Sequence, residues 1–256
     1  MKKNKKGKGK LFLIVGIILV ICVMGFVYLV IEDIKQEDIL KQEIVNVSNK
    51  DLLNDNFNIE VKTKGDYAYI EEAVKKYYQE LSNSIKVINN YLNDESLINI
   101  LSADSLVADH PNFINSYQIL EKTKTNVTES IQTIANLCEE ETIKNLIDRE
   151  KVDDYSYELY LKLMYTEEDL KFLQETKQES EILSQNLTLF LDKVKEILDM
   201  LVRNNGRWTI ENGQIYFDTN SLVTEYNNLY NELNKIASEK FSSIKKETDK
   251  TTKSDI

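Results

Sequence analysis

Glycine and proline are scarce in this chain, and their scarcity limits the folds that it can adopt. The 256 residues include seven glycines and one proline, about 3% together where average usage would give roughly 12%. Because few tight turns are available, we expect long regular elements. Only three glycines follow residue 31, so a glycine-rich phosphate-binding loop is not expected.

Histidine and cysteine are almost absent, which argues against metal and nucleophile chemistry. His110 is the single histidine, and the two cysteines are Cys22 and Cys138. A zinc site needs three or four His, Cys or acidic ligands. Cys138 lies at the spacing of an apolar helix stripe, so we expect a buried structural thiol, and Cys22 lies in an apolar segment where it cannot pair with Cys138.

The acidic clusters over 139–141 and 167–169 do not change this conclusion. Neither cluster has the Asp-x-Asn-x-Asn-Gly core of a calcium-binding loop, and helix starts attract carboxylates without any ligand. We therefore expect no catalytic residue, no metal, no cofactor and no enzymatic activity.

Charge is divided unequally along the chain. The 43 acidic and 32 basic residues give a net charge of −11, yet residues 1–10 contain six lysines and no acid. The rest of the chain is therefore strongly acidic. Nucleic-acid binding needs a basic surface that displaces counterions, so we expect no nucleic-acid partner.

A long apolar run follows the lysines. Leu11 to Ile31 form 21 positions without a charge, about 31 Å as a helix, which matches the hydrocarbon core of a bilayer. The positive-inside rule places residues 1–10 in the cytoplasm and the C-terminal domain outside the cell. The C-terminal end of the run, FVYLVIEDIK, lacks a small-x-small cleavage motif, so an uncleaved signal anchor is favoured over a signal peptide. Gly16 and Gly25 lie nine residues apart and form no small-residue dimer motif.

Helical periodicity dominates the rest of the sequence. We expect long helices over 66–92, from Pro111 to Cys138, from Thr166 to Val202 with a capping box, and from about Ser221. Shorter helical stretches are expected around 97–107, 143–147 and 155–165, and Phe57, Ile59 and Val61 alternate as in a short strand. Asn212-Gly213 between Trp208, Ile210, Ile215 and Phe217 predicts a hairpin over 207–217.

These patterns predict a mostly α protein, in which an N-terminal transmembrane helix precedes an antiparallel helical bundle with one small β-hairpin. The expected divisions are a cytoplasmic basic tail (1–10), a transmembrane signal anchor (11–31), a stalk or linker (32–65), an extracytoplasmic helical domain (66–245) and a disordered tail (246–256). An extended coiled coil is the alternative. The breaks at Gly65, Pro111, Gly206 and Gly213 favour a chain folded back on itself.

Tyrosine is frequent outside the apolar run, and tyrosine is favoured at protein interfaces. Four tyrosines cluster in the helix YSYELYLKLMY, and they cannot all face one core. We therefore predict a candidate partner surface at Tyr155, Tyr157, Tyr160 and Tyr165.

Three stretches carry a resemblance: 100–113 (ILSADSLVADHPNF), 153–164 (DDYSYELYLKLM) and 206–217 (GRWTIENGQIYF). Their succession resembles uncharacterised Gram-positive (Firmicutes-type) single-pass membrane-anchored extracytoplasmic helical proteins. The resemblance implies a location and no activity. We expect an interaction or structural module of the bacterial cell envelope that binds a protein or another envelope component. The alternative is an extracytoplasmic sensor or regulator acting through lateral contact with another membrane protein.

Overall fold

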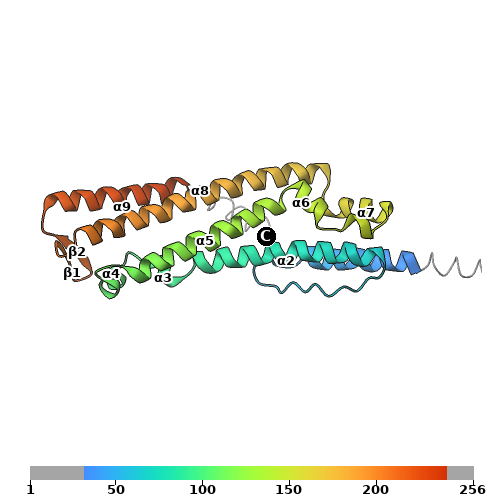
Figure 1. Cartoon of the computed structure of the whole chain (residues 1–256), viewed down its shortest axis with the longest axis horizontal. Coiled ribbons are helices and arrows are strands. Elements are labelled where there is room, and N and C mark those ends of the chain that lie inside the picture. Colours follow the sequence, from blue (N-terminus) through green and yellow to red (C-terminus); the bar gives the residue numbers. More distant parts are fainter. Residues whose placement is uncertain (1–31, 241–256) are drawn as a thin grey trace, which may run out of the picture. The chain divides into compact units, whose positions relative to one another are not determined.

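The computed structural model describes residues 32–240, apart from the side chains of residues 167 and 168. The expected cytoplasmic tail (1–10), membrane anchor (11–31) and disordered tail (246–256) lie outside the described residues. Between 32 and 240, no helix is both long enough and apolar enough to cross a membrane. The described chain is mostly helical with one small antiparallel hairpin, which confirms this part of the predicted fold class (Figure 1).

The described chain divides into two compact units, whereas we expected one domain over 66–245 after a stalk. Unit 1 comprises 32–51, 55–79 and 145–164, and unit 2 comprises 52–54, 80–144 and 165–240. The helix α2 (Asp66–Leu92) contributes Asp66–Gln79 to unit 1 and Glu80–Leu92 to unit 2. A periodic stripe reveals one continuous helix, but it does not reveal which other segments cover each part of that helix.

Unit 1 contains a helix over 32–48, the first part of α2, a 3-10 turn η1 (Arg149–Lys151) and α7 (Asp154–Met164). Figure 1 shows the helix over 32–48 in blue beside the cyan start of α2. Leu40, Ile70 and Tyr160 have no exposed surface. The segment 32–65 is therefore a packed part of unit 1 and not the expected stalk, because Leu40, Glu43 and Val47 give its helix a buried face with helical spacing.

The segment 55–65 precedes α2 in the sequence and runs alongside it, and it does not form the expected strand at 57–61. No neighbouring strand offers its backbone there. Side chains from α2 bind the backbone instead: Gln79 Nε2 donates to the carbonyl of Phe57 at 3.1 Å, and Lys75 Nζ donates to the carbonyl of Glu60 at 2.7 Å. Alternating apolar residues therefore predicted an extended segment but not the kind of partner that holds it.

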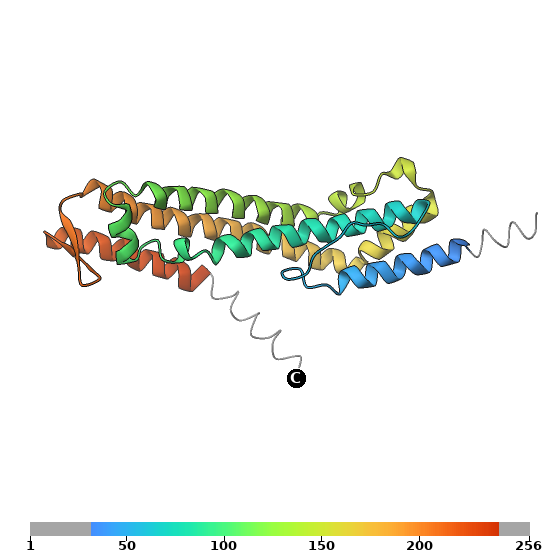
Figure 2. The same ribbon diagram turned by 90° about the horizontal axis from the view of Figure 1, so that it is seen from below.

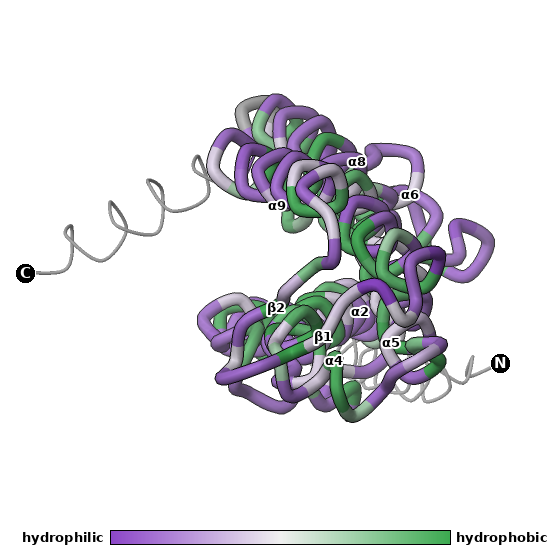
Figure 3. Tube along the Cα trace, turned by 90° about the vertical axis from the view of Figure 1, so that its left-hand side faces the viewer, coloured by the Kyte–Doolittle hydropathy of each residue, from purple (hydrophilic) through white to green (hydrophobic). Residues whose placement is uncertain are grey.

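Unit 2 is built around α5 (Ile114–Leu137) and α8 (Glu167–Arg203), which run side by side in Figures 1 and 2. Their apolar stripes meet, as predicted from the sequence. In Figure 3, hydrophilic residues dominate the outer sides of α8 and α9. The buried core of unit 2 includes Leu106, Phe113, Leu120, Val127, Ile131, Leu191, Val194, Ile197, Leu198 and Leu201.

Polar contacts fix the antiparallel register of α5 and α8. Tyr117 Oη donates to Asp199 Oδ1 at 2.6 Å, and Lys124 Nζ pairs with Asp192 Oδ1 at 2.7 Å. A step of seven residues forward along α5 thus matches a step of seven residues backward along α8. This heptad spacing is the geometry of antiparallel helices that pack at a shallow angle.

The start of α5 differs from the prediction. We expected Pro111 at the first helical position, but the helix begins at Ile114 and Pro111 lies in the turn after α4 (Ala103–Asp109). The Asp109 carboxylate accepts hydrogen bonds from the backbone N–H groups of Asn115 and Ser116 at 3.1 and 2.7 Å. It therefore stabilises a helix start at Ile114, three residues after the predicted start at Pro111, because a helix start requires acceptors for its free N–H groups.

Shorter elements complete unit 2. They are α3 (Glu95–Ile98), α6 (Glu140–Asn145), β1 (Trp208–Glu211), β2 (Gln214–Phe217) and α9 (Asn220–Lys240). The Thr166–Asp169 capping box of α8 and the Asn212-Gly213 hairpin are confirmed, and both turn residues have positive φ, 53° and 75°. The hairpin lies against the bundle through Trp208, whose Nε1 donates to the carbonyl of Leu201 at 2.9 Å.

Replacing a buried leucine of α8 should selectively weaken unit 2. Leu198→Ala should lower the free energy of unfolding by about 2–5 kcal/mol, because a cavity adds to the lost apolar burial. Leu189→Ala, on the exposed side of the same helix, should cost less than about 1 kcal/mol. Urea unfolding followed by the fluorescence of Trp208, the only tryptophan, measures both. Equal losses for the two variants would contradict the assigned core.

Candidate functional site

The four tyrosines of the candidate partner surface fall in different units. Tyr155, Tyr157 and Tyr160 lie on α7 in unit 1, whereas Tyr165 belongs to unit 2. Tyr160 is buried and Tyr155 is exposed, and the Arg149 guanidinium lies 4.7 Å from the centre of the Tyr157 ring. The structure therefore brings three of the four together on one helix and places one of these three in the interior.

His110 and Cys138 both occupy structural positions. His110 ends α4, with its Nε2 atom 2.8 Å from Asn205 Oδ1 and its ring centre 5.2 Å from that of Trp208, in a T-shaped arrangement. Cys138 ends α5, where burial raises the pKa of its thiol. All of α5 separates the two residues. Among residues 32–240, no group of three His, Cys, Asp or Glu side chains is arranged to hold a metal ion.

A buried ionic cluster in unit 1 is the first candidate site. Lys75 Nζ lies 2.8 Å from Glu43 Oε2 and 2.6 Å from Glu71 Oε1. Lys75 is 5% exposed and Glu71 is fully buried. Glu71 also accepts hydrogen bonds from the backbone N–H groups of Lys62 and Thr63 and from the Thr63 hydroxyl at 2.7 Å.

Opposite charges keep this cluster ionised. Burial alone would raise the pKa of the Glu43 carboxyl, but the ammonium groups of Lys62 and Lys75 outweigh burial and lower it to about 2. Burial likewise opposes ionisation of Glu71, and hydrogen bonds from Lys75 and Thr63 lower its pKa. Burial would lower the pKa of Lys75, whereas Glu43 and Glu71 raise it.

The cluster has a structural role, which we call the clamp: Glu71 and Lys75 hold the backbone of residues 60–63 against α2. The three hydrogens of the Lys75 ammonium match its three acceptors, which are Glu43, Glu71 and the Glu60 carbonyl. The sequence did not predict this cluster. The available signal was the Glu71–Lys75 pair at a spacing of four, placed directly beside the stripe residues Ile70 and Val74. Charged pairs at this spacing usually face solvent, so only the packing reveals that this one is buried.

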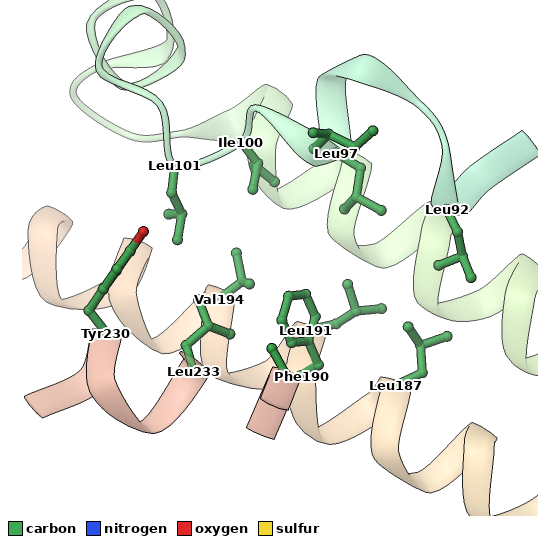
Figure 4. A pocket seen from close by; sticks show the side chains of 12 residues that line it. Leu92, Leu97, Ile100, Leu101, Leu187, Phe190, Leu191, Val194, Tyr230 and Leu233 are labelled. Carbon is green, nitrogen blue, oxygen red and sulfur yellow. The ribbon is translucent and has the colours of Figure 1, made fainter. Parts of the chain in front are cut away.

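An apolar groove in unit 2 is the second candidate site. Its cavity volume is 460 Å³, and none of its twelve lining residues is charged. Figure 4 shows two facing rows of side chains, with Leu92, Leu97, Ile100 and Leu101 on one side and residues of α8 and α9 on the other. The lining residues are Leu92, Leu97, Ile98, Ile100, Leu101, Leu187, Phe190, Leu191, Val194, Tyr230, Leu233 and Ala237.

A second hollow of 490 Å³ extends the apolar surface toward the hairpin and shares Leu101 with the groove. Aromatic rings connect the two hollows along α9. The ring centres of Phe217 and Tyr226 are 5.4 Å apart, and those of Tyr226 and Tyr230 are 6.0 Å apart. Together the two hollows form a strip that is apolar along the groove and more polar toward the hairpin, where Gln214 and Asn227 also line it.

The composition of the groove favours binding over catalysis. Its only side-chain polar atom is the Tyr230 hydroxyl, so general acid–base work has no pair of groups there. An open groove lined by leucine, isoleucine and aromatic side chains suits an apolar ligand surface. The predicted stripes already contained Leu92, Leu187, Phe190, Val194 and Leu233, but a stripe does not tell which of its residues stay uncovered.

Removing the buried ammonium should destabilise unit 1. Lys75→Met leaves the buried Glu71 carboxylate without its cation and leaves Glu43 paired with Lys62 alone, which should lower the free energy of unfolding by about 3–5 kcal/mol. Lys76→Met is the matched control, because Lys76 pairs with Glu72 on the exposed side of α2 and should cost less than about 0.5 kcal/mol. Hydrogen exchange at the amides of residues 62–64 measures the loss. Unchanged exchange in Lys75→Met would refute the clamp.

Acid should weaken unit 1 through the same carboxylates. The folded pKa values of Glu43 and Glu71 lie below 4.5, so the native state binds fewer protons than the unfolded state. The stabilisation is therefore complete above about pH 4.5 and is lost as the pH falls toward about 2.

Urea unfolding at pH 6 and pH 3 tests this pH dependence, with circular dichroism for both units and Trp208 fluorescence for unit 2. Wild type should lose more stability between the two values than Glu43→Gln, which lacks one of the two carboxylates. An equal loss in the two proteins would mean that Glu43 does not titrate as described.

Comparison with protein-family models, with curated proteins and with solved structures found no match. A proposal of function therefore depends on the sequence and the geometry of this chain. Of the two candidate sites, the ionic cluster has its polar groups satisfied internally, whereas the apolar groove is open.

Proposed function

We propose that this protein is a membrane-anchored interaction module of the bacterial cell envelope that holds another protein on the extracytoplasmic side. The observation that carries the proposal is the uncovered apolar groove of unit 2. Exposed apolar surface of this kind costs free energy in water, and soluble proteins retain it mainly where a partner covers it.

The sequence before residue 32 supports the membrane location. The lysine-rich residues 1–10 and the apolar run from Leu11 to Ile31 have the order and length of a signal anchor. A module anchored in this way needs no cytoplasmic activity. Its role is to keep a binding surface at the membrane, where tethering raises the effective concentration of the surface toward partners in the same envelope.

The positions of the chemically reactive residues support binding over catalysis. Cys138 is buried with a raised pKa, and His110 contacts Asn205 and Trp208. The acidic surface of unit 2, which has twice as many Asp and Glu as Lys and Arg residues over its described length, repels nucleic acid. A protein partner remains the class that fits an apolar groove in an acidic surface.

Site-specific photocrosslinking in intact Gram-positive cells tests the proposal. A photoreactive amino acid replaces Ile98, which lines the groove and is 64% exposed, or Val107, which lies outside the groove and is 61% exposed. We expect a discrete protein adduct from position 98 and none from position 107. External protease should remove a C-terminal tag from the same cells without permeabilisation.

Two outcomes would overturn the proposal: equal adducts from both positions, or a C-terminus protected from external protease. Exchanging the run from Leu11 to Ile31 for an unrelated transmembrane helix separates a module from a sensor that acts by lateral contact. The adduct at position 98 should survive this exchange. Its loss would favour the sensor, because only that mechanism needs specific contacts of the membrane helix.

A further inference from the structure

One face of α9 forms a continuous wall of the apolar strip. Val223, Tyr226, Tyr230, Leu233 and Ala237 follow a spacing of three and four residues, and all line one of the two hollows. This face extends over roughly 21 Å at the helical rise of 1.5 Å per residue. The main contacts of α9 are with α8 and β2, so the groove lies where a bundle would place its next helix.

A segment that binds in the groove has to hydrogen-bond its own backbone N–H and C=O groups. The helices that line the groove use their N–H and C=O groups internally, so an extended peptide would find a strand edge only beside β2, at the hairpin end of the strip. A bound helix brings its backbone hydrogen bonds with it and presents apolar side chains at the spacing of the wall. Helix-in-groove binding is therefore the mode that this geometry favours.

The acidic residues beside the groove indicate which charge the solvent-facing side of such a helix should have. Asp94 and Glu95 precede the lining residues Leu97 and Ile98, and Asp104 follows Leu101. All three acids are exposed, and among the described residues none of them is in an ion pair. A basic helix would gain attraction at this rim, and an acidic helix would be repelled.

We propose, on the basis of the proposed function, that the partner segment is a basic amphipathic helix of about 14 residues or more. Its apolar face fills the strip along α9, and its lysines or arginines lie near Asp94, Glu95 and Asp104. A second copy of this chain is a poorer occupant. It is itself acidic, and the part of α9 outside the wall presents Asn228, Asn231 and Asn234.

Three fluorescent 18-residue peptides test the proposal. The first has leucine and phenylalanine at i, i+4, i+7 and i+11 with lysines elsewhere. The second has the same apolar positions with glutamates elsewhere, and the third is the first with its residues scrambled. Anisotropy titrations use the full-length chain in nanodiscs of neutral lipid, and empty nanodiscs give the background. The basic peptide should bind at least about tenfold more tightly than the other two.

Matched variants assign the binding to the groove. Ala237→Gln places a polar side chain in the groove, whereas Ala108→Gln makes the same change at an exposed position of α4. Ala237→Gln should lower the affinity for the basic peptide about tenfold, and Ala108→Gln should leave this affinity unchanged. The double variant Asp94→Asn, Glu95→Gln should reduce the preference for the basic over the acidic peptide. The emission of Trp208 verifies that each variant is folded.

The proposal fails if Ala237→Gln binds the basic peptide as wild type does, or if the acidic peptide binds equally well. It also fails if a fluorescent fatty acid binds in a manner sensitive to Ala237→Gln while no peptide does, which would identify an acyl chain as the occupant. Crosslinking between two copies through position 98 would identify a homodimer. A position-specific adduct with another protein in cells, combined with no peptide preference, would leave the proposed function intact and remove only this partner class.

Discussion

The antiparallel packing of α5 on α8 is the interaction on which unit 2 depends. Each helix has one apolar stripe, and neither stripe can stay in water without a large cost in free energy. The heptad register set by Tyr117–Asp199 and Lys124–Asp192 brings the two stripes together along most of α5. α9 and the hairpin then pack on the far part of α8, and the groove is the apolar surface that this arrangement leaves uncovered.

Unit 1 is held together on a different basis. Its extended segment 55–65 has no strand partner, so the side chains of Glu71, Lys75 and Gln79 bind the backbone in its place. Burying these charges is costly unless every donor and acceptor is matched. Lys75 meets this condition with three acceptors. The specific geometry of the segment therefore depends on polar pairing, whereas the specific geometry of unit 2 depends mainly on apolar packing.

Local patterns in the sequence predicted local structure well. α2, the capping box of α8 and the Asn212-Gly213 hairpin were predicted correctly, because spacing, caps and turn residues act over a few positions. The predicted start of α5 was three residues too early, because Asp109 and not Pro111 determines where the helix begins. The two candidate sites bring together residues from distant segments, such as Glu43 and Lys75 in the ionic cluster or Leu97 and Leu191 in the lining of the groove. Periodicity within one helix contains no information about which distant segments meet.

We propose that the open apolar groove of unit 2 lies outside the cell and that a partner covers it there. Thiol labelling with a membrane-impermeant maleimide tests it most directly, using Ala237→Cys and Ala108→Cys in a chain with Cys22→Ser and Cys138→Ala. Both cysteines should react in the purified protein. In intact cells both should react without permeabilisation, with position 237 slowed relative to position 108. A cysteine at 237 that is inert in the purified protein, or labelling of either site only after permeabilisation, would contradict the account.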